Sequence, residues 1–225
     1  MEREKDNNLY VEIETELVKN VYDNIAHHFN YTRAYKWKWI NEFIECYDNT
    51  NILYDIGCGS GRNIIPPLNK ADKFPKCIGI DNCNNFINIC REKKLEVYKC
   101  DMLSLPFKNN SADAIISIAS FHHLSTLERR IGTLLEMKRV LKKSNKNNNI
   151  GRILLSVWSI NQPENTRRKF RYGDIIVPWN NHDEIFNRYY YIFKISELYQ
   201  LFEKVGLNIE KHFWDYGNEI FILTK

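Results

Sequence analysis

The chain has 225 residues, a mass of 26.9 kDa and a mildly basic charge of +4 at neutral pH. Hydrophobic residues make up 44% of it, which suffices for the core of one large domain. No apolar stretch approaches the ~18 residues of a membrane span, so the pattern excludes an integral helical membrane protein and predicts no membrane partner.

Cysteine spacing and the first residues bear on metals and compartment. The six cysteines include no C-x-x-C pair, so we expect no sulfur-ligated zinc and no metal ligands in this chain. The opening MEREKDNNLY lacks the apolar segment of a signal peptide. We therefore expect reduced thiols and a cytoplasmic protein, with the nucleus as a second compartment.

The predicted elements begin with two helices that follow a flexible segment, residues 1–9. Apolar residues recur at helical spacing from Val11 to Phe29, and a second helix covers Trp37 to Cys46, so residues 10–50 form a helical cover. Strands then alternate with helices: strands at 52–56, 77–80, 96–100, 114–119 and 153–158, and helices from about 63, at 84–93 and at 127–141. This alternation predicts an α/β fold with a mostly parallel sheet and helices on both faces.

The last third of the chain departs from this alternation. Residues 160–190 show no clear period, so we expect an insertion at 160–195 on the substrate side. A last helix runs from Ser196, its expected N-cap, to Val205 before Gly206, and residues 208–214 and 219–223 form an antiparallel hairpin. The sheet then has seven strands in a single domain, 10–225, and the polar stretch 142–151 is a solvated loop.

Three glycines follow the first strand in YDIGCGSGRN: Gly57, Gly59 and Gly61. Glycine adopts positive φ and lets a ligand lie against the backbone at the carboxyl end of a strand. A dinucleotide fingerprint needs glycine at position 62, where this chain has Arg62. The spacing resembles instead the Rossmann-like class I methyltransferases, whose cofactor is S-adenosyl-L-methionine (AdoMet).

Two acids at later strand ends support an AdoMet site. Asp81 ends the second strand, where a carboxylate can hold both hydroxyls of a ribose. Asp101 ends the third, where it can accept from the adenine amino group beside Met102. Either acid could instead cap the helix that follows it, but the glycine turn and both acids in this order favour AdoMet. The predicted cofactor-binding set is Tyr22, Arg33, Asp55, Gly57, Cys58, Gly59, Gly61, Asp81, Asn82, Asp101, Met102 and Ala119.

Four further stretches are similar to a particular family, the eukaryotic tRNA wobble-uridine methyltransferases that esterify 5-carboxymethyluridine. They are VYDNIAHHFNYTR (21–33), ISIASFHHLSTLERR (116–130), VPW (177–179) and RYYYIFKISELYQLF (188–202). The resemblance implies methyl transfer from AdoMet to the carboxylate of the wobble nucleoside of tRNA, giving a methyl ester and S-adenosyl-L-homocysteine. It also implies a heterodimer with a small zinc-binding activator protein, for which the edge of the third strand would be a suitable docking site.

The resemblance also implies roles at the acceptor end of the site. His122, His123 and Arg129 are the candidates that orient the acceptor and pair with its carboxylate, although each could merely pack or face solvent. The carboxylate has a pKa near ~4, so it is already ionised and needs no strong general base. The expected substrate-binding residues are Arg130, Trp158, Arg167, Arg168, Trp179, Arg188, Tyr189 and Tyr190, several of which could pack against the sheet instead.

Two other functions stay open at this point. The chain could methylate a small carboxylic acid or a quinone, or it could be a non-catalytic, methyltransferase-like binding subunit. The intact glycine turn and the two acids speak against a silent subunit, because such a chain has no need to hold the nucleoside.

Overall fold

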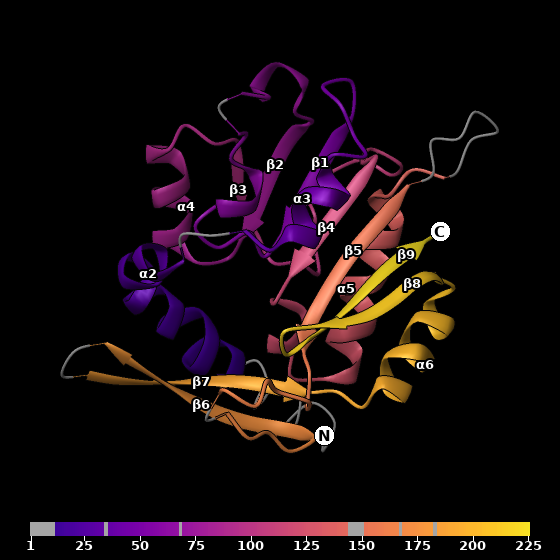
Figure 1. Ribbon diagram of the computed structural model, residues 1–225. Helices are drawn as coiled ribbons and strands as arrows, with labels where there is room; N and C mark the ends of the chain where they lie inside the picture. Colours follow the sequence, from indigo (N-terminus) through magenta and orange to yellow (C-terminus); the bar gives the residue numbers. More distant parts are fainter. Residues whose placement is uncertain (1–11, 34–35, 68, 144–150, 167, 182–183) are drawn as a thin grey trace.

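A seven-stranded sheet organises the structure, a computed structural model that describes residues 12–33, 36–67, 69–143, 151–166, 168–181 and 184–225. The strand order is β3-β2-β1-β4-β5-β9-β8 (Figure 1). The strands are β1 (Ile52–Ile56), β2 (Lys76–Asp81), β3 (Val97–Lys99), β4 (Ala114–Ile118), β5 (Arg152–Trp158), β8 (Asn208–Asp215) and β9 (Asn218–Thr224). The first five are parallel and the last two form an antiparallel hairpin against β5, so the expected fold class is confirmed.

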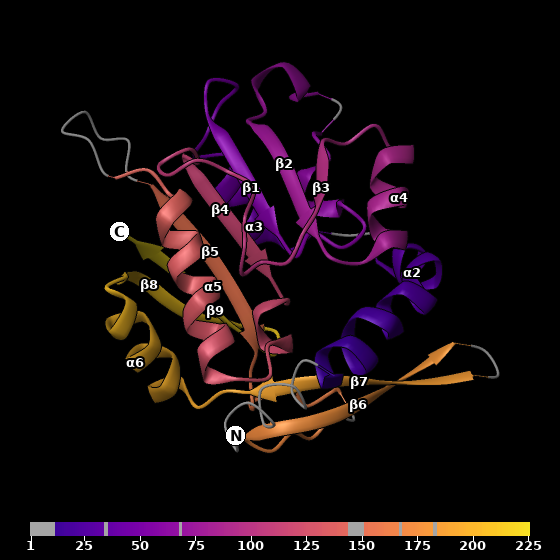
Figure 2. The same cartoon turned by 180° about the vertical axis from the view of Figure 1, so that it is seen from behind.

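Helices cover both faces of this sheet (Figures 1 and 2). Helices α5 (Leu127–Val140) and α6 (Ile195–Val205) pack on one face through Leu134 and Phe202, and α3 (Lys38–Ile44) packs on the other through Ile40. Strand β4 is apolar at almost every position because it is buried on both sides, as is typical of a central parallel strand.

The N-terminal segment lies across the carboxyl ends of the parallel strands (Figure 1). It contains a π-helical stretch, η1 (Thr15–Lys19), followed directly by α2 (Asn20–Thr32). Helix α2 packs against α4 (Asn84–Glu92) through Ala26, Phe86 and Ile89. Short 3₁₀ turns complete the loops: η2 (Arg62–Ile64), η3 (Ala71–Lys73) and η4 (Phe121–His123).

The region without a clear period contains an antiparallel hairpin that the sequence analysis missed. Strands β6 (Gly173–Asn181) and β7 (Glu184–Ile192) pair with Val177 opposite Arg188, in a two-stranded sheet separate from the main one. The hairpin runs beside α2 at the same edge of the main sheet (Figures 1 and 2). Its alternation is hidden because Pro178 and charged residues interrupt the apolar positions.

Two helices differ in detail from what their sequences indicate. Helix α5 exposes the apolar residues Leu127 and Leu135 and buries Arg130 and Thr133. The N-cap of α6 is Lys194 and not Ser196, since the Glu197 carboxylate accepts from the Lys194 backbone N–H at 2.7 Å. Gly206 ends α6 in the left-handed conformation, as predicted.

Some expectations concern residues or features outside this description. The predicted flexible segment 1–9 and most of the loop at 142–151 lie outside the described residues.

Within the described ranges, no helix is long and apolar enough to span a membrane. The same part of the chain holds no group of three or more side chains that could bind a metal ion.

Candidate active site

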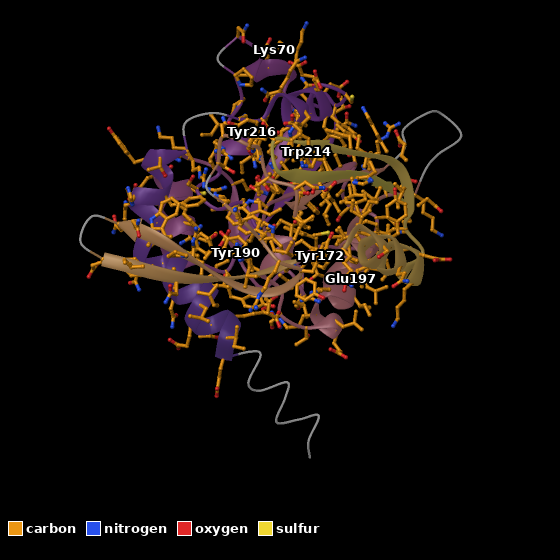
Figure 3. The ribbon with its side chains drawn as sticks, turned by 60° about the horizontal axis from the view of Figure 1, so that its bottom comes forward. Lys70, Tyr172, Tyr190, Glu197, Trp214 and Tyr216 are labelled. Carbon is orange, nitrogen blue, oxygen red and sulfur yellow. The ribbon has the colours of Figure 1, made fainter. Side chains whose placement is uncertain are left out.

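A cavity of about 850 Å³ opens where the parallel strands end. Its floor comes from the loops after β1, β2, β3 and β4, and its walls come from the N-terminal segment and from β7. Figure 3 views the molecule from this side, with Tyr190 of β7 and Tyr216 of the β8–β9 turn labelled; both line the cavity. This is the edge at which open α/β sheets bind ligands.

The glycine turn leaves bare backbone beside this cavity. Gly57, Gly59 and Gly61 all have positive φ, at 78°, 52° and 75°. A Cβ on Gly57 would lie 2.4 Å from the Cβ of Ser120, and one on Gly61 would lie 2.5 Å from Leu95. A Cβ on Gly59 would lie 3.9 Å from its nearest neighbour, so crowding does not explain the glycine at this position. Its positive φ and the space that it leaves for a ligand do.

Asp81 combines the two roles that the sequence left open. Its carboxylate accepts from the backbone N–H of Gly59 at 2.8 Å and of Cys83 at 2.9 Å, which orders the turn and the start of α4. Each oxygen keeps a lone pair for a further donor, and Asp81 lines the cavity with Asn82. Burial raises the pKa of Asp81 to about 6. The acceptor atoms and the bare turn together fit the ribose and chain of AdoMet.

Asp101 lines the far end of the same cavity, beside Met102. Its Oδ1 accepts from the Leu103 backbone N–H at 3.0 Å, and its Oδ2 accepts from Arg129 at 2.9 Å. Arg129 was expected to hold the substrate carboxylate. Its guanidinium instead bridges Asp101 and Glu14, so the structure puts it at the adenine end of the predicted cofactor site.

A chain of hydrogen bonds through His123, Tyr22 and Tyr190 forms the cavity wall opposite Asp101. His123 Nδ1 lies 2.7 Å from the Tyr189 carbonyl and therefore donates to it, so Nε2 of the neutral ring accepts from the Tyr22 hydroxyl at 3.1 Å. The Tyr190 hydroxyl, 3.0 Å from that of Tyr22, then donates to it. Burial lowers the pKa of His123 to about 3. His123 is thus neutral at pH 7, and both of its ring nitrogens are held by hydrogen bonds within the protein.

His122 has a different arrangement. Its ring is fully buried and its Nδ1 accepts from the Trp158 backbone N–H at 3.0 Å, so the ring proton lies on Nε2. Nε2 has no hydrogen-bond partner among the described residues, and His122 lines the cavity. Burial and the neighbouring His123 lower the pKa of His122. The neutral ring therefore carries an Nε2–H that no described residue accepts.

The low pKa of His123 predicts a pH-dependent stability that a variant can isolate. In the unfolded chain histidine binds a proton near pH ~6.5, but in the folded protein only near pH 3. Below pH ~6.5 the unfolded state therefore binds more protons, and folding loses about 2 kcal/mol between pH ~6.5 and ~5 through this residue. The variant His123→Gln should lose correspondingly less between pH 7 and 5, as measured by urea unfolding.

The matched control for that measurement is His27→Gln, on the exposed side of α2. The comparison uses the change in the free energy of unfolding between pH 7 and pH 5, so any loss of packing at position 123 that does not depend on pH cancels. Equal pH dependence in wild type and His123→Gln would contradict the expectation.

Arg188 is the most unusual charge in the site. It is 3% exposed and lines the cavity, yet no acidic side chain in the described part of the chain pairs with it. Its Nε has no partner there, and its Nη1 makes only a long contact of 3.5 Å to the Tyr22 hydroxyl. The guanidinium lies 4.8 Å from the centre of the Trp179 ring and 5.3 Å from that of Tyr190. The guanidinium is thus surrounded by aromatic rings, and no acidic side chain among the described residues pairs with it.

The structure brings most of the predicted residues into one cavity. Those that line it are Tyr22, Arg33, Gly57, Cys58, Gly59, Asp81, Asn82, Asp101, Met102, Ala119, His122, His123, Arg129, Trp158, Arg168, Arg188 and Tyr190. Ala119 has a φ of 53°, which is strained for a residue with a Cβ and is typical of functional loops. Arg167 lies outside the described residues.

Five predicted residues do not line the cavity. Asp55 is fully buried in β1, where burial and then Asp81 raise its pKa to about 7, and Gly61 packs against Leu95 and Cys90. Arg130 donates to the carbonyls of Leu124 and Ser125 and stacks on Tyr191. Tyr189 points to the opposite face of β7 from Tyr190 and bonds Asp174, and Trp179 packs behind Arg188 and bonds His28.

The sequence motifs did not predict every residue that lines the cavity, and Glu14 and Tyr216 are two examples. Glu14 accepts from Arg129 and Ser125, and Tyr216 lies at the mouth with its ring centre 6.1 Å from that of Trp37. Neither belongs to a motif. The contacts of Glu14 join residues more than 100 positions apart, which no local pattern reveals.

Comparison with known proteins identifies the class first. Residues 54–146 match a family model described as a methyltransferase domain. A SAM-dependent methyltransferase from Aquifex aeolicus superposes with a TM-score of 0.56 at 17% identity, covering 83% of this chain and 89% of that one. A methyltransferase from Haloferax volcanii, solved with the Trm112 activator, has a TM-score of 0.65 at 17% identity, covering 92% and 96%. The fold is that of the class I AdoMet-dependent methyltransferases.

The sequence relatives identify the family. A tRNA (carboxymethyluridine(34)-5-O)-methyltransferase from Schizosaccharomyces pombe is 32% identical over 231 residues, covering 92% of this chain and 96% of its own length. A Xenopus tropicalis protein of the same name is 29% identical over 270 residues, covering 95% of this chain but only 41% of its own length. The chain belongs to the tRNA (carboxymethyluridine(34)-5-O)-methyltransferase family, and the resemblance noted from its motifs is confirmed. It spans less than half the length of several of these relatives.

Proposed function

We propose that this chain transfers a methyl group from AdoMet to the carboxylate of 5-carboxymethyluridine at the wobble position of tRNA, giving the methyl ester. Arg188 is the observation that carries the proposal. A buried guanidinium without an anionic partner is costly, and an ionised carboxylate of the acceptor would satisfy it with charge-assisted hydrogen bonds. The names of the family relatives support the same acceptor.

Different residues bind the cofactor and the acceptor, at two ends of the cavity. When bound, AdoMet supplies an electrophilic methyl group on sulfur. Asp81 and Asp101 hold the nucleoside, and Arg188 and the Nε2–H of His122 position the carboxylate oxygens. Since the carboxylate is ionised above pH ~4, the site needs orientation and exclusion of water rather than a base.

The charge of the cavity supports an RNA substrate. Among the described residues, seven cationic side chains line it against three acidic ones: Lys19, Arg33, Lys36, Arg62, Arg129, Arg168 and Arg188 against Glu14, Asp81 and Asp101. The Arg168 guanidinium lies 4.9 Å from the centre of the Trp158 ring, and that ring stacks on Tyr190 at 4.2 Å. A stacked aromatic wall with cations at its edge suits an extruded base and its flanking phosphates.

We further propose a small zinc-binding activator as the partner. Strand β3 is an edge of the main sheet, and Tyr98 on it is 44% exposed. An edge strand with free backbone groups accepts an added strand from another chain. The Haloferax volcanii methyltransferase of similar fold was solved with the Trm112 methyltransferase activator.

Nucleoside mass spectrometry tests the function. tRNA lacking the methyl ester is incubated with the chain, a co-expressed activator and isotope-labelled AdoMet, and is then digested. The expected product is carboxymethyluridine that has gained one labelled methyl group. Equal methylation of the free nucleoside or of small carboxylic acids would favour the small-molecule alternative. Binding of S-adenosylhomocysteine without any turnover would favour a silent subunit.

A further inference from the structure

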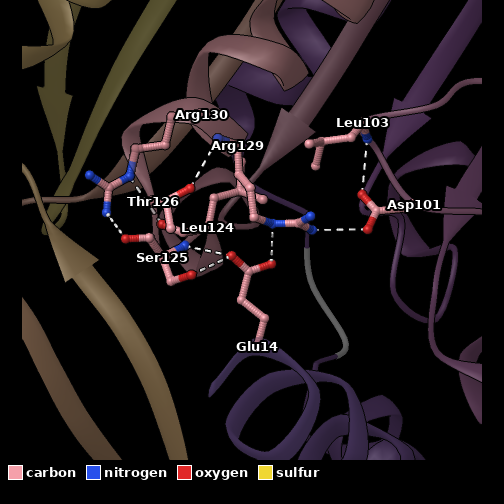
Figure 4. Close-up of polar contacts among 8 residues, drawn as sticks. All are labelled: Glu14, Asp101, Leu103, Leu124, Ser125, Thr126, Arg129 and Arg130. Carbon is pink, nitrogen blue, oxygen red and sulfur yellow. Dashed lines mark hydrogen bonds and ion pairs between the residues drawn. The ribbon is translucent and has the colours of Figure 1, made fainter. Parts of the chain in front are cut away.

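An ion-pair network joins the N-terminal segment to the adenine end of the cavity (Figure 4). Glu14 Oε2 accepts from Arg129 Nε at 2.8 Å, and Arg129 Nη2 donates to Asp101 Oδ2 at 2.9 Å. The other Glu14 oxygen accepts from both the backbone N–H and the hydroxyl of Ser125, each at 2.7 Å. One glutamate thereby connects the N-terminal segment, the first turn of α5 and the end of β3.

This network is well shielded from solvent. The side chains of Glu14 and Arg129 are 13% and 21% exposed, whereas that of Asp101 is 42% exposed towards the cavity. Burial works against the charge of Arg129, but Glu14 and Asp101 together raise its pKa above the usual value. Surface ion pairs contribute little, but a shielded pair that loses one member leaves a charge without a partner.

The network also restricts what Asp101 can accept. Leu103 and Arg129 hold one oxygen each, so the carboxylate cannot rotate freely, and a carboxylate accepts hydrogen bonds without donating any. A fixed acceptor matches the amino group of adenine. It disfavours hypoxanthine, which presents a carbonyl oxygen at the same position.

The N-terminal segment has a local feature that suits this role. Directly after Glu14 the chain is π-helical over Thr15–Lys19, and Glu14, Val18 and Lys19 all line the cavity. A π-helical turn is wider than an α-helical one and is common at functional sites. It lets these side chains face the ligand together.

We propose that Glu14 and Arg129 are positioning residues that fasten the N-terminal helix over the adenine end of the cavity and fix Asp101 as an adenine-selective acceptor. This inference rests on the proposed use of AdoMet. The same ion pair then holds the N-terminal helix over the ligand and fixes the carboxylate that recognises the base. The ligand therefore cannot leave until the Glu14–Arg129 pair opens.

Binding of S-adenosylhomocysteine and of its hypoxanthine analogue, S-inosylhomocysteine, tests the inference without any turnover. Glu14→Gln keeps the size of the side chain but removes its charge and presents an amide N–H₂ to Arg129 or Ser125. We expect its Kd for S-adenosylhomocysteine to rise about tenfold, chiefly through faster dissociation in stopped-flow measurements. The preference for the adenine analogue should shrink in the same variant and in Arg129→Lys.

The matched control is Glu45→Gln, which removes an exposed ion pair with Lys70 far from the cavity lining. It should bind both analogues as the wild type does. Binding and base preference of Glu14→Gln within twofold of wild type would overturn the inference while leaving the proposed function intact. A wild-type chain, with activator, that binds neither analogue would overturn both. A general loss of folding would lower the binding of both analogues equally, which also counts against a selective role.

Discussion

Replacement of Arg188 by methionine is expected to lower kcat/KM for the tRNA acceptor at least ~100-fold while making the protein more stable. The loss in activity follows because the charge-assisted hydrogen bonds to the acceptor carboxylate are worth about 3 kcal/mol together. The gain in stability follows because the substitution removes a buried charge that has no partner in the described chain. We expect the free energy of unfolding to rise by about 1–3 kcal/mol, measured by urea unfolding without ligands.

Arg130 provides a matched control in the same part of the molecule. It is also buried, at 6% exposure, but it donates to the carbonyls of Leu124 and Ser125. Arg130→Met leaves these carbonyls without their donors, so it should lower the free energy of unfolding by about 2–4 kcal/mol. If both arginine variants were destabilised equally, or if Arg188→Met kept its activity, Arg188 would not be the anion-binding residue.

The second large effect is expected at Gly57. A Cβ there would lie 2.4 Å from the Cβ and 2.6 Å from the Oγ of Ser120, and φ is 78°. Gly57→Ala should therefore lower the free energy of unfolding by about 2–4 kcal/mol, from backbone strain plus overpacking. It should also abolish detectable binding of S-adenosylhomocysteine, because the turn or the loop after β4 has to move.

Two further variants separate the causes of that effect. Gly59→Ala meets no atom closer than 3.9 Å, so in the absence of ligand only the strain of its positive φ remains, about 1 kcal/mol. The double variant Gly57→Ala with Ser120→Gly removes the clash and should recover part of the stability. Equal losses at positions 57 and 59 would contradict the steric explanation.

The sequence predicted the main sheet well because its signals are local. Most of the parallel strands are short apolar runs, and the topology carries Asp81, at the end of β2, and Asp101, just after β3, to one edge of the sheet. The β6–β7 hairpin was missed because its apolar face is broken by Pro178 and by charges. Without that hairpin, the alternation that turns Arg188 and Tyr190 inward and Tyr189 outward could not be seen.

The site predictions failed where contacts are long-range. Nothing near Arg129 in the sequence indicates that it pairs with Glu14, 115 positions away, rather than with a substrate. Arg130 was placed in the substrate site because it shares the Glu-Arg-Arg motif with Arg129. One residue along a helix turns the side chain by about 100°, however, which takes Arg130 into the core.

The β6–β7 hairpin pairs separately from the main sheet, so its register can change without a change in that sheet. A slip of one residue in β7, with Asn187 rather than Arg188 opposite Val177, would replace the cation in the cavity wall by an amide and put Tyr189 in the place of Tyr190. The main sheet, the glycine turn and the nucleoside acids would be untouched by that slip. Changes of acceptor during evolution can therefore arise by re-registering one ribbon, without rebuilding the machinery that holds the methyl donor.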